Sequence, residues 1–156
     1  LSSKPGGLNS VPKAPFPLYP LTMRWLVKEE PENYSFDQFV ADGSTVWSGV
    51  RNPVAQKNLR AMKKGDRVFF YHTGKEKAVV GTAKVEAPAY PDPKDTSGRL
   101  VVVELVPDKK LKRPVTLAEI KAAGRFADFA LVRIPRLSVM PVTEEQWEAI
   151  EAMSRA

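Results

Sequence analysis

Apolar residues fall into short extended runs and short helical repeats, and the two kinds do not alternate regularly along the chain. Runs rich in Val, Leu, Phe and Trp favour strands, especially where Gly, Pro or charged residues bound them. These runs predict extended segments at 24–28, 45–47, 67–72, 78–86, 99–106 and 129–134. Because residues 73–77 form a connection of hairpin length, we expect 67–72 and 78–86 to be antiparallel neighbours.

Two helices are predicted in the first half of the chain. Ser35 can cap a short helix whose inner face carries Phe36, Phe39 and Val40. Asn52 and Pro53 suit the N-cap and N1 positions of the second helix, which we expect to end at Gly65. Its apolar positions repeat at i, i+4 and i+7 and are Ala55, Leu59 and Met62.

Two more helices are predicted from the spacing of a capping box, in which Thr is followed three residues later by Glu or Gln. Thr116 with Glu119 starts a helix that Gly124 closes, and Thr143 with Gln146 starts a C-terminal helix. The inward positions of the C-terminal helix are Trp147, Ile150 and Met153.

Five or six strands and three or four helices in irregular order predict an α+β domain, whose mostly antiparallel sheet closes into a small barrel. A doubly wound parallel sheet is disfavoured because the connections after residue 66 are too short for parallel crossovers. Residues 1–22 hold five of the 14 prolines and no acidic residue, which predicts a disordered tail. We expect residues 23–156 to form the folded domain.

Composition narrows the possible functions. The absence of Cys and the presence of one His exclude a structural zinc cluster, a Cys nucleophile and a Cys/His dyad. No apolar run approaches the roughly 20 residues that span a bilayer, so we expect no membrane association and a cytoplasmic protein, or a nuclear one in a eukaryote. No cofactor loop or catalytic constellation is visible, which predicts a protein that is not an enzyme and needs no cofactor.

The chain is basic, and its excess charge is concentrated in one segment. Lys plus Arg number 24 against 18 acidic residues, for a net charge of +6. Residues 51–77 contain eight basic and two acidic residues, so this segment alone carries +6. Lys57, Arg60 and Lys64 lie at i, i+3 and i+7, on the helix face opposite the apolar one. This pattern fits either a surface for an anionic partner or a merely solvated helix face.

The residues just before that helix favour the anionic partner. A helix start exposes unpaired backbone N–H groups that suit a phosphate, and Arg51 adds a forked donor beside them. Trp47 leads into this turn and offers a ring that can stack on a planar ligand. Trp47 can instead be a core residue, and Asn52 a plain N-cap. His72 ends an apolar strand, where an imidazole is more often a satisfied structural group than a catalyst.

Six ordered motifs resemble the EVE domain family over nearly all of 23–156. They are Trp25–Pro31 (WLVKEEP), Trp47–Asn52 (WSGVRN), Leu59–Asp66 (LRAMKKGD), Phe69–His72 (FFYH), Ala89–Asp92 (AYPD) and Arg136–Pro141 (RLSVMP). The resemblance implies a PUA-like pseudo-barrel that is related to the YTH readers of methylated adenine in RNA. It also implies recognition of modified bases, including modified cytosines in DNA.

The resemblance further implies roles for individual residues. Trp47 would form the stacking wall of a base pocket, with Ser48 as a polar contact beside it. Lys28 and Glu30 would come from the first strand, and Tyr71 and His72 from the facing one. Arg51 and Asn52 would hold the backbone near a flipped nucleotide. On the charge pattern, and not on the resemblance, we expect the basic face of Lys57, Arg60 and Lys64 to contact the nucleic-acid backbone and, with Arg51, to supply the net affinity. The chain departs from common relatives at Glu29 and Val54, where Ser and Gln are frequent.

We therefore predict a monomeric, non-catalytic domain that binds nucleic acid and reads a modified base by flipping it into an aromatic pocket. The sequence leaves open which modification is read and whether the partner is DNA or RNA. Two alternatives remain: a sensor of a small molecule or free nucleotide that uses the same pocket, and an enzyme acting on modified nucleic acid.

Overall fold

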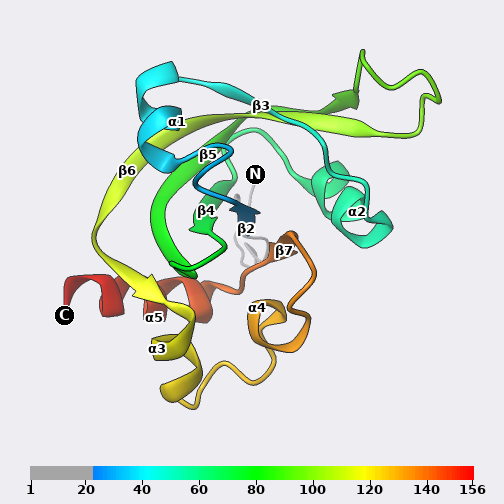
Figure 1. Cartoon of the computed structure of the whole chain (residues 1–156). Coiled ribbons are helices and arrows are strands. Elements are labelled where there is room, and N and C mark those ends of the chain that lie inside the picture. The colour runs from blue at the N-terminus through cyan, green and yellow to red at the C-terminus, as the bar shows by residue number, and fades with distance from the viewer. Residues whose placement is uncertain (1–22) are drawn as a thin grey trace, which may run out of the picture.

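The computed structural model describes residues 23–156, so the predicted tail at 1–22 lies outside the described residues. A curled six-stranded sheet in the order β3-β6-β5-β4-β2-β7 forms a half-barrel with short helices around it (Figure 1). The strands are β2 (Arg24–Glu29), β3 (Thr45–Trp47), β4 (Arg67–His72), β5 (Ala78–Pro91), β6 (Val101–Thr116) and β7 (Val139–Pro141). The helices are α1 (Phe36–Asp42), α2 (Pro53–Ala61), α3 (Leu117–Ala122), α4 (Ala130–Arg133) and α5 (Glu144–Arg155). This architecture confirms the predicted α+β class.

The sheet is mostly antiparallel, as predicted. Strands β2 and β4 form the parallel pair, and their connection through α1, β3 and α2 provides the long crossover that parallel neighbours need. The hairpin of β4 and β5 is confirmed as an antiparallel pair. Between residues 23 and 156, no helix is both long enough and apolar enough to cross a membrane.

Consecutive residues of β4 send their side chains to opposite faces of the sheet, where different helices cover them. Phe70 packs against Phe36 and Phe39 of α1, with ring centroids 5.4 and 5.5 Å away. Phe69 stacks on Trp147 of α5, with a centroid distance of 3.6 Å and an interplanar angle of 10°. Figure 1 shows the two helices on different sides of the sheet. The alternation at 69 and 70 thus gives both faces an aromatic core.

A buried carboxylate ties the start of β2 to the segment that connects α2 with β4. Asp66 accepts hydrogen bonds from the backbone N–H of Met23, the indole N–H of Trp25 and the backbone N–H of Lys63, each at 2.9 Å. Charge-assisted bonds of this kind offset the cost of burying the carboxylate. Asp66 therefore holds the parallel pair together where both strands begin.

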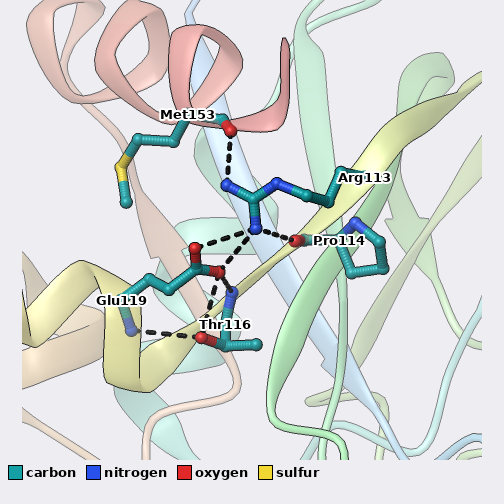
Figure 2. A network of polar contacts seen from close by, with 5 residues as sticks. All are labelled: Arg113, Pro114, Thr116, Glu119 and Met153. Carbon is teal, nitrogen blue, oxygen red and sulfur yellow. Dashed lines mark hydrogen bonds and ion pairs between the residues drawn. The ribbon is translucent and has the colours of Figure 1, made fainter. Parts of the chain in front are cut away.

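A second polar network joins the end of β6 to α3 and α5 (Figure 2). The Arg113 guanidinium donates to both carboxylate oxygens of Glu119, at 2.9 and 2.8 Å, and to the Met153 carbonyl at 2.7 Å. The predicted capping box of Thr116 and Glu119 is present. The Thr116 backbone N–H, and then Arg113, lower the pKa of the Glu119 carboxyl. Glu119 thus serves as a helix cap and as an ion-pair partner.

Several predicted boundaries are wrong. The segment 129–134 was expected to be extended, but it contains the one-turn helix α4, closed by a hydrogen bond from Ile134 N–H to the Ala130 carbonyl at 2.8 Å. Helix α2 ends at Ala61, not Gly65, so Lys64 lies beyond it. Val40 was expected on the inner face of α1 but is exposed.

Strands β5 and β6 are longer than predicted. The sequence predicts extended segments at 78–86 and 99–106, yet β5 continues past residue 86 to Pro91. Its pairing with β4 stops at Lys84, so residues beyond that point pair with β6 alone. Proline is tolerated where one side of a strand has no ladder to complete. Strand β6 likewise continues to Thr116, past Pro107 and Pro114.

The packing of α1 on the sheet predicts that Gly81→Ala destabilises the protein. A Cβ at this position of β5 would lie less than 3.0 Å from three ring atoms of Phe36. Overpacking of this kind costs about 1 to 3 kcal/mol, which urea unfolding would show as a lower midpoint. In the Phe36→Leu background the same change should cost less. Equal costs in both backgrounds would contradict the steric explanation.

Candidate nucleic-acid interface

The turn from Ser48 to Asn52 connects edge strand β3 to α2 and carries the central residues of the predicted site. Gly49 has φ of 78°, a left-handed conformation that suits glycine and lets the chain reverse. Ser48 and Arg51 are exposed, and Arg51 has no ion-pair partner among residues 23–156. The turn therefore presents a free guanidinium next to the start of a nine-residue helix.

Asn52 is the N-cap of α2, as the sequence predicts. Its side-chain oxygen accepts hydrogen bonds from the backbone N–H groups of Val54 and Ala55, at 2.9 and 3.0 Å. Those two N–H groups are thus unavailable to a phosphate. A contact between Asn52 and a nucleic-acid backbone remains a prediction, and it would use the side-chain NH₂ group.

Trp47 lies on the inner face of the curled sheet and is 5% exposed. Its ring meets Phe70 edge-on, with centroids 5.5 Å apart and an interplanar angle of 83°. This burial agrees with the core role that the sequence also allowed. It conflicts with the expectation of an open aromatic wall, because little of the indole faces solvent in this conformation. A stacking role remains a prediction that requires more of the indole to be exposed than in this conformation.

Gln56, which the sequence analysis did not single out, fixes this turn in place. Its side chain is buried, and its NH₂ group donates to the carbonyls of Val50 and Val101 at 2.7 and 3.2 Å. Its carbonyl accepts the Val101 N–H at 2.9 Å. Gln56 thereby joins the turn, α2 and the start of β6. In the sequence, only its position next to Ala55, on the edge of the apolar face of α2, indicates that the Gln56 side chain is buried.

The predicted cationic face of α2 is only partly present. Lys57 is exposed and has no ion-pair partner within the described residues. Arg60 donates a hydrogen bond to the Arg99 carbonyl, in the loop between β5 and β6. Because Lys64 lies after the helix has ended, it does not continue the helical row that the spacing of i, i+3 and i+7 predicts. Contacts of these residues with a nucleic-acid backbone remain predictions.

Lys28 and Tyr71 lie together at the ends of β2 and β4. The Lys28 ammonium is 5.7 Å from the centre of the Tyr71 ring and donates to the Pro135 carbonyl at 2.8 Å. Burial lowers the pKa of Lys28 and raises the pKa of Tyr71 to about 12. The two side chains lie side by side near the segment after α4, with Tyr71 buried and Lys28 partly buried, and a contact of either with a ligand remains a prediction.

His72 lies on the opposite face from Tyr71, so the two side chains do not line one common surface. Its Nε2 accepts the Phe36 backbone N–H at 3.0 Å, and its Nδ1 is 2.7 Å from the Glu76 carboxylate. Both ring nitrogens are thus occupied, and the neutral ring carries its proton on Nδ1. A contact between His72 and a ligand remains a prediction, and the present partners of the ring fit the structural role that the sequence also allowed. The ring aligns α1 with the end of β4.

Glu30 is exposed just after β2 and lines a hollow of about 310 Å³ with residues 73–76. The contacts therefore divide the predicted residues into separate groups: the turn with α2, the pair of Lys28 and Tyr71, His72 with α1, and Glu30 at this hollow. No cluster of three or more metal-ligating side chains occurs in the described part of the chain.

This chain is similar to known proteins in sequence and in fold. The model of the EVE domain family matches residues 23–153. Human thymocyte nuclear protein 1 is 30% identical over 164 residues, which cover 83% of this chain and 73% of the relative. Two solved structures are also similar.

The NMR structure of Rpa0253 from Rhodopseudomonas palustris is 48% identical, with a TM-score of 0.82, over 86% of this chain and 94% of the other. The crystal structure of the human THYN1 protein in complex with DNA containing 5-methylcytosine is 28% identical. Its TM-score is 0.80, over 86% of this chain and 99% of the other.

The hydrogen bonds of the Gln56 side chain can be tested by removing them. Gln56→Leu keeps the side-chain volume similar but removes the partners of the Val101 N–H and of two carbonyls. Buried groups left without partners cost about 1 to 3 kcal/mol each, so unfolding should begin at lower urea concentration. Amide exchange of Val101 should also accelerate more than exchange in the β4 strand. Uniform acceleration across both strands would show that Gln56 does not hold this region locally.

Proposed function

The chain belongs to the EVE domain family, and on that premise we propose that it is a non-catalytic nucleic-acid-binding domain that reads a modified base. Modified cytosine in DNA is the first candidate, because the human THYN1 protein has been solved with DNA containing 5-methylcytosine. The similarity extends over 86% of this chain, so it includes the turn and α2.

The observation that carries this proposal is the exposed positive charge beside the start of α2. Arg51 and Lys57 have no acidic partner within residues 23–156, and they lie just before and within the N-capped helix α2. Unpaired cations release counterions from nucleic acid when they contact phosphates, which gives affinity that falls steeply with salt. Arg also matches phosphate geometry with its forked donors.

We further propose that Trp47 captures a base that has been extruded from the nucleic acid. Extrusion costs a few kcal/mol, and stacking on an aromatic ring returns about 1 to 3 kcal/mol. Because the indole is 5% exposed, its surroundings must also rearrange to admit a base. Phosphate contacts therefore supply most of the net affinity, and base contacts supply discrimination.

The role of Trp47 is tested by Trp47→Leu, with Trp47→Phe as the conservative partner. We measure fluorescence anisotropy on paired oligonucleotides that differ only in one 5-methylcytosine, after checking by circular dichroism that each variant is folded. Trp47→Leu should remove the preference for the modified oligonucleotide and leave salt-dependent background binding. Trp47→Phe, which retains a ring, should keep part of the preference.

Equal loss of binding to both oligonucleotides in folded Trp47→Leu would argue against stacking. Mononucleotides that bind wild-type protein as tightly as oligomers do would favour the sensor of free nucleotides. RNA oligonucleotides that bind more tightly than DNA of the same sequence would assign the reader to RNA.

The role of the cationic turn is tested by Arg51→Gln combined with Lys57→Gln. Affinity should fall alike for modified and unmodified oligonucleotides, and the slope of log K against log salt should decrease by about 0.7 to 0.9 for each lost phosphate contact. Arg125→Gln is the matched control, because Arg125 is exposed and lies in the connection between α3 and α4, which belongs to neither the turn nor α2. An unchanged slope in the double variant would make this surface merely solvated.

A further inference from the structure

The loop of residues 92–100, between β5 and β6, is unusually well fixed for an exposed connection. A single carboxylate, that of Asp95, accepts hydrogen bonds from the backbone N–H groups of Ser97, Arg99 and Leu100, at 3.1, 3.0 and 2.8 Å. It also accepts the Ser97 hydroxyl, at 2.8 Å to one oxygen and 2.9 Å to the other. The Leu100 bond, followed by the Ser97 hydroxyl, lowers the pKa of Asp95.

This loop is also fastened to α2. Arg60 donates to the Arg99 carbonyl, and Gln56 holds Val101, the first residue of β6. Figure 1 shows the loop extending above α2 at the same end of the molecule. The turn at 48–52, helix α2 and the loop are thus connected by side-chain to backbone bonds, and they should move together.

The acidic and basic side chains of the loop differ in whether they have partners. Its two acidic residues and two basic residues cancel in number. Both carboxylates, however, are engaged by the loop's own backbone, Asp92 by the Lys94 N–H at 2.9 Å and Asp95 as described. The side chains of Lys94 and Arg99 are exposed and have no ion-pair partner among residues 23–156. The loop therefore presents its cations outward.

We propose that residues 92–100 form a second contact with the phosphate backbone of the nucleic acid bound at α2, with Arg99 as the main donor and Asp95 as the residue that orients it. The proposal rests on the proposed function. It follows from three observations: the loop is fastened to α2 by Arg60, its carboxylates are satisfied internally, and its cations are unpaired. Arg60 then serves as a positioning residue for the loop.

A rigid loop is what such a contact requires. Ordering a mobile arginine on a phosphate costs conformational entropy, which is lower when the backbone beneath it is already fixed. Four donors on one carboxylate fix the backbone on both sides of Gly98, whose φ of 74° sets the reversal. The loop, the turn and α2 carry unpaired cations and are joined by hydrogen bonds, so the partner that fits them is a continuous polyanion. In the proposed complex this is the sugar-phosphate chain of the bound oligonucleotide.

The first test compares Arg99→Gln with Arg51→Gln and the Arg125→Gln control, using anisotropy on one oligonucleotide over a range of salt. Arg99→Gln should weaken binding severalfold at low salt and lower the slope of log K against log salt by about 0.7 to 0.9. Arg125→Gln should leave both quantities unchanged. If Arg51→Gln lowers the slope and Arg99→Gln does not, the loop contact is overturned while the proposed function stands. If wild-type protein binds no oligonucleotide, the proposed function itself fails.

The second test separates orientation from charge. Asp95→Asn removes a negative charge near the oligonucleotide, so simple electrostatics predicts tighter binding. The proposal predicts weaker binding, because the loop loses acceptors and Arg99 is no longer held. In the Arg99→Gln background, Asp95→Asn should cause no further weakening. Tighter binding by folded Asp95→Asn, or equal weakening in both backgrounds, would overturn the orienting role.

Discussion

The buried amide of Gln56 is the contact on which the candidate site depends. A curled sheet of six strands leaves its two sides apart, and α2 connects them: Gln56 holds Val101 of β6, the strand next to edge strand β3, and Asn58 donates to the Val139 carbonyl of edge strand β7 at 2.7 Å. The same Gln56 amide holds the Val50 carbonyl. The position of the turn therefore depends on the position of α2. If α2 were displaced from the sheet, the turn would be displaced with it. A neutral amide suits this position because it donates and accepts at once without burying a charge.

The interior of the half-barrel imposes a competing demand on Trp47. Its ring completes an aromatic cluster with Phe70, Phe36 and Phe39, and His72 adds a hydrogen bond to the start of α1. Edge-on contacts of this kind stabilise the core beyond the area they bury. An indole that also stacks on a base has to expose a face without leaving this cluster. Stacking on a base and packing against Phe70 therefore compete for the same ring.

Sequence patterns predicted most elements because each depended on local chemistry: Ser35, Asn52, Thr116 and Thr143 all cap the helices expected of them. The predictions failed where contacts between residues far apart in the sequence determine the structure. Pro88 and Pro91 lie within β5 because β4 no longer pairs with that end of the strand, which no local pattern reveals. The same holds for the site. The helical spacing placed Lys57 and Arg60 on one face, but the use of Arg60 by the Arg99 carbonyl depends on a loop 39 residues away.

In the proposed complex, different parts of the molecule supply the affinity for nucleic acid and the discrimination between modified and unmodified bases. The energies of stacking and of base extrusion explain this division. Stacking of about 1 to 3 kcal/mol hardly exceeds the cost of extruding a base, so a pocket alone would bind weakly. Phosphate contacts are independent of the base and add up along a surface, yet they carry no information on its modification. An exposed, rigid frame of turn, helix and loop can therefore hold any strand for long enough that a buried indole samples its bases. The frame has to stay rigid while Trp47 gains exposure, and Gln56, which holds the turn to α2 and β6, supplies that rigidity.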